Sequence, residues 1–201
     1  MQGCNQATLK ILCLKWLETA CGKPRGRYGY QIMKTLDIAI RQADRNDANA
    51  IASVHGSAWR GAYAGIIPHK ALNTMINRRG TDWWLRVINR SGAVFVADVG
   101  GVIAGYVTFG RNRARQLSQQ GEIYELYLLP EYQGVGLGTK LFDQARKALK
   151  AHNLSGLVVW ALDDNIAANS FYHGLGGRDV AEGVETFDDK TLKKVAYVWN
   201  R

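Results

Sequence analysis

The run from Leu126 to Thr139 constrains the fold more than any other part of the sequence, because it joins three kinds of local structure. A strand-like stretch is stopped by Pro130, and three glycines follow at alternate positions before an amphipathic stretch begins. Glycine lets the backbone approach a ligand closely and adopt positive φ angles. The first turn of a helix offers free N–H groups at the positive end of its dipole. The run therefore predicts a strand, a loop and a helix arranged to bind a phosphate or pyrophosphate.

Two common phosphate-binding motifs do not fit this glycine run. A Walker A loop ends in Gly-Lys followed by Ser or Thr, whereas this run ends Gly138-Thr139-Lys140. A dinucleotide-binding fingerprint needs Gly-x-Gly-x-x-Gly at the start of a βαβ unit. Here Gly134, Gly136 and Gly138 are evenly spaced and follow a predicted hairpin, so that motif is excluded as well.

From residue 37 onward the chain alternates between strand-like and helix-like periodicity. A helix is predicted from about 136 to 151 because an apolar residue recurs every four positions, at Leu137, Leu141, Ala145 and Leu149. Asp44 and Asp47 resemble an N-cap and a first-turn acid at the start of the first helix. Other elements are expected as helices at about 44–58, 72–76, 81–88 and 165–172, and as strands at about 38–40, 94–98, 102–109, 122–129, 156–162, 179–187 and 194–199. This mixture of hairpins and crossover helices predicts a single α/β domain with a mixed central sheet of about seven strands flanked by helices.

Residues 1–36 differ in composition from the rest of the chain. They carry all three cysteines and, with six Lys or Arg against one Glu, five of the nine net positive charges. We expect a basic N-terminal extension over 1–36, and the main domain over 37–201. The extension would be an accessory helix, a transit-like peptide, or a segment ahead of a true start at Met33.

Composition also bounds the partners and the location. The body of the chain is only mildly basic, which argues against a nucleic-acid partner. No apolar run approaches the roughly 20 residues that span a bilayer, so no membrane partner is expected. Three scattered cysteines indicate a reducing, cytoplasmic setting. The four histidines are also scattered, so no metal site is predicted.

Two motifs resemble the GNAT superfamily of acetyl-coenzyme-A-dependent N-acetyltransferases. The first is its Gln/Arg-x-x-Gly-x-Gly/Ala signature, read here as Gln133-Gly-Val-Gly136-Leu-Gly138 after a strand that ends at Pro130. The second is the run Asn165-Ile-Ala-Ala-Asn-Ser-Phe-Tyr172, which resembles the family's Asn-x-x-Ala-x-x-Phe/Leu-Tyr helix. Gly176-Gly177 replaces the usual Gly-Phe that follows. The resemblance covers about 37–199.

The resemblance implies a fold and a cofactor site. The strands near 122–129 and 156–162 would splay apart around the pantetheine arm of acetyl-coenzyme A, which serves as co-substrate. The backbone of Leu128 and Leu129 would pair with that arm, and the Leu128 N–H would point at the thioester oxygen. Asn165 would contact the arm. The pyrophosphate would be held by the loop residues Gln133, Gly134, Gly136, Gly138 and Thr139.

The resemblance also implies catalytic residues for transfer to a primary amine. Glu122 matches the place of a catalytic glutamate in family members that acetylate histones, and would act as the general base. It shares one face of a strand of period two with Leu128, and the same parity puts the rival Glu125 on the opposite face. A water chain is a further alternative for the base, and Glu122 could also be a rim residue that closes the loop. Tyr172 would be the general acid, or an aromatic ring packed beneath the cofactor.

The acceptor is less defined than the cofactor. Trp59 and Tyr63 lie in a region that borders the acceptor site in the family, where they could line an amine pocket or simply pack in the core. Arg111, Arg113 and Arg115 could attract an acidic substrate or the adenosine phosphates, or form a solvated loop. The acceptor would be an amine of a small molecule or protein, and a homodimer is compatible with the family. The alternatives are a non-catalytic acyl-coenzyme-A sensor and a nucleic-acid binder that uses the basic N-terminal segment.

Overall fold

The fold comes from a computed structural model that describes residues 37–200. The predicted extension over 1–36 lies outside the described residues. The sheet has seven strands in the order β1-β2-β3-β4-β5-β7-β6. Their bounds are β1 Ile38–Gln42, β2 Val94–Val99, β3 Val102–Arg111, β4 Gly121–Leu128, β5 Leu157–Leu162, β6 Arg178–Phe187 and β7 Lys190–Trp199. Only β4 and β5 run parallel, so the mixed α/β sheet expected from the sequence is confirmed.

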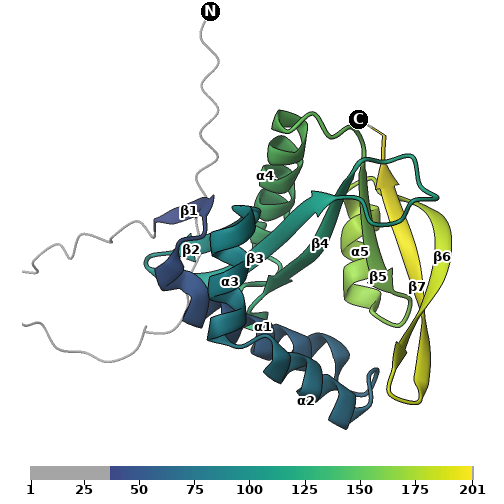
Figure 1. Cartoon of the computed structure of the whole chain (residues 1–201), viewed down its shortest axis with the longest axis horizontal. Coiled ribbons are helices and arrows are strands. Elements are labelled where there is room, and N and C mark those ends of the chain that lie inside the picture. The colour runs from purple at the N-terminus through teal and green to yellow at the C-terminus, as the bar shows by residue number, and fades with distance from the viewer. Residues whose placement is uncertain (1–36, 201) are drawn as a thin grey trace, which may run out of the picture. The chain divides into compact units, whose positions relative to one another are not determined.

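Five α-helices flank the sheet (Figure 1). Their bounds are α1 Ala48–Tyr63, α2 His69–Arg78, α3 Thr81–Ser91, α4 Leu137–Ala151 and α5 Ile166–Gly174. Helices α1 and α3 pack on one face of the sheet, whereas α4 and α5 pack on the other. No helix among residues 37–200 is long and apolar enough to cross a membrane.

The sequence signals that predicted α4 and the start of α1 act as expected. All four periodic residues of α4 are at most 2% exposed, so one face of the helix is buried against the sheet. Before α1, Asp44 accepts a hydrogen bond from the Asn46 N–H at 2.7 Å, and the Asp47 carboxylate accepts one from the Asp44 N–H at 2.8 Å. Asp47 also accepts from Arg41 at 2.7 Å, which ties the cap to β1. This capping box opens a single 3-10 turn, Arg45–Asp47, which runs directly into α1.

Strand β4 contains a bulge that changes which side chains share a face. Thr108 of β3 pairs with Glu125, but the next residue, Phe109, pairs with Ile123, so Tyr124 is the extra residue. Ile123 and Leu128 consequently lie in the same core cluster on the α4 face, although they are five residues apart. A regular strand would place them on opposite faces.

Candidate functional site

A groove opens between β4 and β5. The two strands pair only from Gly121 to Ile123 of β4, although both continue further. Beyond that point lies a cavity of about 620 Å³, lined by residues of α1, β4, the glycine loop, β5 and α5. Residues predicted from the sequence account for much of the lining: Leu128, Gln133, Gly134, Gly136, Gly138, Thr139, Asn165, Tyr172 and Tyr63.

The glycine loop presents backbone to this groove. Gly134 and Gly136 have φ angles of 74° and 85°, a region that side-chain-bearing residues seldom adopt. Gly136 is also the N-cap residue of α4. A Cβ on Gly138 would lie 3.2 Å from the Phe171 ring, so any larger residue would push that ring aside by a few tenths of an ångström. The free N–H groups of the first turn of α4 therefore face a cavity large enough for an anionic ligand.

Leu128 and Leu129 have different places at the strand edge. The Leu129 N–H donates to the Ala104 carbonyl of β3 at 2.8 Å, and the Leu129 carbonyl accepts from Tyr132 at 3.0 Å. Because N–H groups alternate between the two edges of a strand, the Leu128 N–H faces the β5 side. Leu128 lines the groove, whereas Leu129 is absent from its lining and has its backbone engaged within the chain. The edge available to a ligand is therefore the one at Leu128.

Asn165 and Tyr172 belong to α5 and its start. The Asn165 side chain accepts a hydrogen bond from the Ala168 N–H at 3.1 Å, so it caps the helix while lining the groove. Tyr172 is 6% exposed, and burial raises the pKa of its hydroxyl above the usual value. The phenol is therefore protonated at neutral pH and can serve as a proton donor.

Glu122 is held within the protein rather than in the groove. Its side chain is 2% exposed and accepts hydrogen bonds from the Arg113 Nη2 at 2.6 Å and from the Arg113 backbone N–H at 2.8 Å. The bulge at Tyr124 overturns the expectation that Glu122 shares a face with Leu128. It places Glu122 and Glu125 on the same face, opposite Leu128.

Glu125 lines the groove that Glu122 does not reach. Its carboxylate accepts a hydrogen bond from the Tyr106 hydroxyl at 2.9 Å and forms an ion pair with Arg79. The side chain of Glu125 is 9% exposed. It is thus a carboxylate held in one orientation by two partners, at the border of a cavity.

Behind Glu125 the hydrogen bonds continue to His55. The His55 Nδ1 lies 2.8 Å from the Tyr106 hydroxyl oxygen. Since that hydroxyl donates to Glu125, we assign the Nδ1 as the protonated nitrogen that donates to Tyr106. Burial, followed by the charge of Arg79, lowers the pKa of His55 to about 3, so the imidazole is neutral. No local pattern in the sequence links His55, Arg79 and Tyr106, which come from α1, the C-cap of α2 and β3.

Of the two aromatic residues predicted for the acceptor region, one lines the groove and the other does not. Tyr63 lines the groove, and its hydroxyl lies 2.9 Å from that of Tyr127. Trp59 does not line the groove. It is 7% exposed and packs against Tyr63, with ring centroids 5.1 Å apart.

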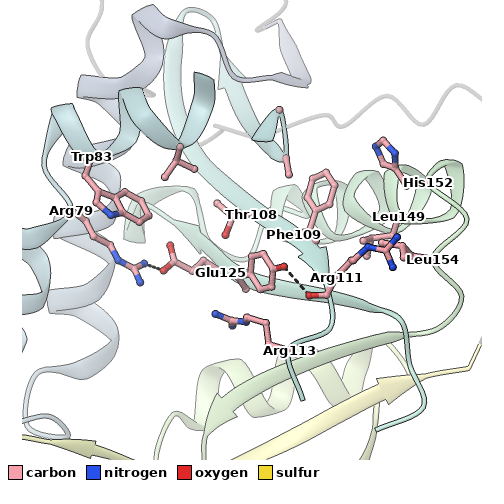
Figure 2. Close-up of a pocket in the computed structure, with 15 residues that line it drawn as sticks. Arg79, Trp83, Thr108, Phe109, Arg111, Arg113, Glu125, Leu149, His152 and Leu154 are labelled. Atoms are coloured by element: carbon pink, nitrogen blue, oxygen red, sulfur yellow. Dashed lines mark hydrogen bonds and ion pairs between the residues drawn. The ribbon is translucent and has the colours of Figure 1, made fainter. Parts of the chain in front are cut away.

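A second cavity of about 660 Å³ lies beside the groove (Figure 2). It runs over the end of β3 and the middle of β4, and shares Tyr124 and Glu125 with the groove. Figure 2 shows the Arg79–Glu125 ion pair within it. The Tyr124 hydroxyl donates a hydrogen bond to the Arg111 carbonyl at 2.8 Å. Within residues 37–200, no three His, Cys, Asp or Glu side chains gather as ligands for a metal ion.

Comparisons with known proteins agree with this geometry. The family model described as "Acetyltransferase (GNAT) family" matches residues 58–176. The chain is 32% identical over 162 residues to the uncharacterized N-acetyltransferase YuaI of Bacillus subtilis, covering 81% of this chain and 92% of that protein. It is 25% identical to the spermidine N(1)-acetyltransferase of Thermoplasma acidophilum, covering 70% of this chain and 88% of that protein.

A solved structure shares the fold. The PaiA N-acetyltransferase of Thermoplasma acidophilum, in complex with coenzyme A, superposes with a TM-score of 0.64 at 21% identity, covering 79% of this chain and 98% of that one. The family match spans the groove, the glycine loop and α5 together. The chain is therefore an acyltransferase that belongs to the GNAT family of acetyltransferases.

Proposed function

We propose that this chain transfers an acetyl group from acetyl-coenzyme A directly to a primary amine. The observation that carries the proposal is the groove between β4 and β5, which runs from the Leu128 backbone edge to the glycine loop at the start of α4. One end of such a groove suits an amide-rich arm and the other suits a pyrophosphate. Coenzyme A bound to the Thermoplasma structure of the same fold supports this choice of ligand.

The chain's own groups would place the co-substrate. The pantetheine arm would lie along the β4 edge at Leu128, and the N–H of Leu128 would stabilise the oxygen of the thioester as charge develops on it. The N–H groups from Gln133 to Thr139 would hold the pyrophosphate. Asn165 would contact the arm from the start of α5. Holding the thioester next to the amine replaces a chance collision with a high effective concentration.

The chemistry needs one proton acceptor and one proton donor. The amine nitrogen attacks the thioester carbonyl carbon, and a C–N bond forms as the C–S bond breaks. We assign the acceptor of the amine proton to Glu125, because it borders the groove whereas Glu122 is buried, lies outside the groove lining and is ion-paired with Arg113. Tyr172 would give its proton to the leaving thiolate, and exchange with solvent would restore both residues. The products are the N-acetylated amine and coenzyme A.

Thiol release tests the proposal. The full chain is incubated with acetyl-coenzyme A and a panel of primary amines, and the free thiol is measured together with the mass of the product. Release that depends on one amine, with an acetylated product, is the expected result. Tight binding of acetyl-coenzyme A without release for any amine would instead favour a non-catalytic sensor.

A further inference from the structure

The second cavity reaches the same carboxylate as the groove. Tyr124 and Glu125 line both spaces, so a molecule in the second cavity and one in the groove would each contact Glu125. If Glu125 accepts the amine proton, the amine must come within hydrogen-bond reach of it. The second cavity offers an approach to Glu125 that leaves the glycine loop and the β5 edge to the co-substrate.

The charges in this cavity are unbalanced. Its lining includes three guanidinium groups, from Arg79, Arg111 and Arg113, against the single carboxylate of Glu125. Arg79 is paired with Glu125, and Arg113 is paired with Glu122 beneath it. Even with Glu122 counted, three positive charges face two negative ones. Among the ion pairs formed within residues 37–200, none involves the exposed Arg111.

The positive and negative ends of the cavity are separated along the sheet. Glu125 pairs with Thr108 on β3, and Arg111 lies three residues further along the same strand, so their side chains point to opposite faces of the sheet and the cavity reaches both around the end of β3 that β2 does not cover. At about 3.3 Å per residue this is roughly 10 Å between backbone positions. Figure 2 shows Glu125 with Arg79 at one end and Arg111 near Leu149 and Leu154 at the other.

We propose that this cavity binds the acceptor as an elongated primary amine with an anionic far end, such as a short peptide with a free carboxylate. The inference rests on the proposed acetyl transfer and names its substrate class. The amine lies at Glu125, the anion lies at Arg111, and apolar groups between them contact Phe109, Leu149 and Leu154. A polyamine would place its second positive charge beside Arg111, where repulsion opposes binding.

Matched acceptors test the inference in the full chain. Thiol release from acetyl-coenzyme A is measured with L-alanyl-L-phenylalanine, with its C-terminal amide, and with spermidine. We expect kcat/KM to be at least about tenfold higher for the carboxylate than for the amide, with spermidine poorer than both. Equal values for the two peptides, or a preference for spermidine, would overturn the inference while acetyl transfer stands. If none of the primary amines tested gives thiol release, the proposed function and this inference both fail.

A variant pair locates the contact. Arg111→Gln should raise KM for the dipeptide carboxylate about tenfold, leaving its kcat and the KM of the amide unchanged. Arg115→Gln is the control, because Arg115 is exposed in the loop that follows Arg111 but does not line the cavity. If the two variants behave alike, the anion is not bound at Arg111.

Discussion

His55 couples the stability of the fold to pH through a single buried residue. Its side chain is fully enclosed, and burial lowers its pKa from the usual 6.5 to about 3. In the unfolded chain the imidazole regains its usual pKa, so between these values the unfolded state binds more protons than the folded one. The contribution of His55 to the free energy of unfolding is therefore fully present above pH 6.5 and is lost as the pH falls toward 3.

This sign gives a prediction for His55→Asn. Urea denaturation should show the free energy of unfolding of the wild type falling by up to about 2.7 kcal/mol from this residue between pH 6.5 and about pH 4.5. The asparagine variant can still donate to Tyr106 but does not titrate, so its loss should be smaller. His152→Asn is the control for the same substitution at an exposed position. Identical pH dependence in the wild type and His55→Asn would contradict the argument.

Glu122 and Arg113 form a pair whose two halves differ in exposure. The Glu122 side chain is 2% exposed and that of Arg113 is 69% exposed. Arg113→Gln leaves a buried carboxylate without its cation, which should cost about 3 kcal/mol of stability. Glu122→Gln leaves a guanidinium that water can solvate, and should cost about 1 kcal/mol. Chemical denaturation of the two variants measures the difference, and an equal or reversed order would show that Glu122 is not the buried partner.

Substitutions of Glu122 and Glu125 should also differ in their effect on kcat. Glu125→Gln should lower kcat by about 10² to 10⁴, because it removes the group that takes the amine proton. Acetyl-coenzyme A binding should be preserved, since the glycine loop is untouched. Glu122→Gln should retain most of the wild-type kcat. Steady-state thiol release with the same acceptor, beside calorimetric titration of the cofactor, distinguishes the roles. A loss of kcat confined to Glu122→Gln would restore that residue as the base.

Strand β4 shows where reasoning from the sequence stops at the scale of an element. Alternation along 122–129 indicates a strand, but it does not reveal that Tyr124 is an extra residue. A bulge exists only relative to a partner strand, and the register with β3 cannot be read from β4 alone. One extra residue moves every side chain before it in the strand to the other face of the sheet. Glu122 therefore lies on the face opposite Leu128 instead of on the same face.

In the loop before α4, a glycine substitution can distinguish an effect on backbone strain from an effect on acetyl-coenzyme A binding. Gly136 and Gly101 both have strongly positive φ, at 85° and 90°, and a Cβ at either would meet nothing within 4 Å. Gly136→Ala and Gly101→Ala should therefore each lower the free energy of unfolding by about 1–2 kcal/mol through backbone strain alone. Only Gly136→Ala should also weaken acetyl-coenzyme A binding, by about tenfold, since only that loop lines the groove. Equal affinity in the two variants would place the pyrophosphate elsewhere.

Across the whole molecule, the sequence predicts the framework better than the polar network. The order of helices and strands, the buried face of α4 and the glycine loop follow from local periodicity and backbone chemistry, and the structure confirms these elements. The chain His55–Tyr106–Glu125, with Arg79 beside it, joins segments separated by up to 70 positions. Such contacts arise when α1 and α3 pack on the sheet, and no local pattern encodes them.

Calorimetric titration of acetyl-coenzyme A into the full chain tests the central claim most directly. The groove between β4 and β5, with one glycine loop at the start of α4, predicts a single binding site per chain. Preincubation with coenzyme A should abolish the heat of that titration, because both ligands share the pyrophosphate and the pantetheine arm. A titration without heat over a range of temperatures, or binding that coenzyme A does not compete with, would contradict the assignment of the groove.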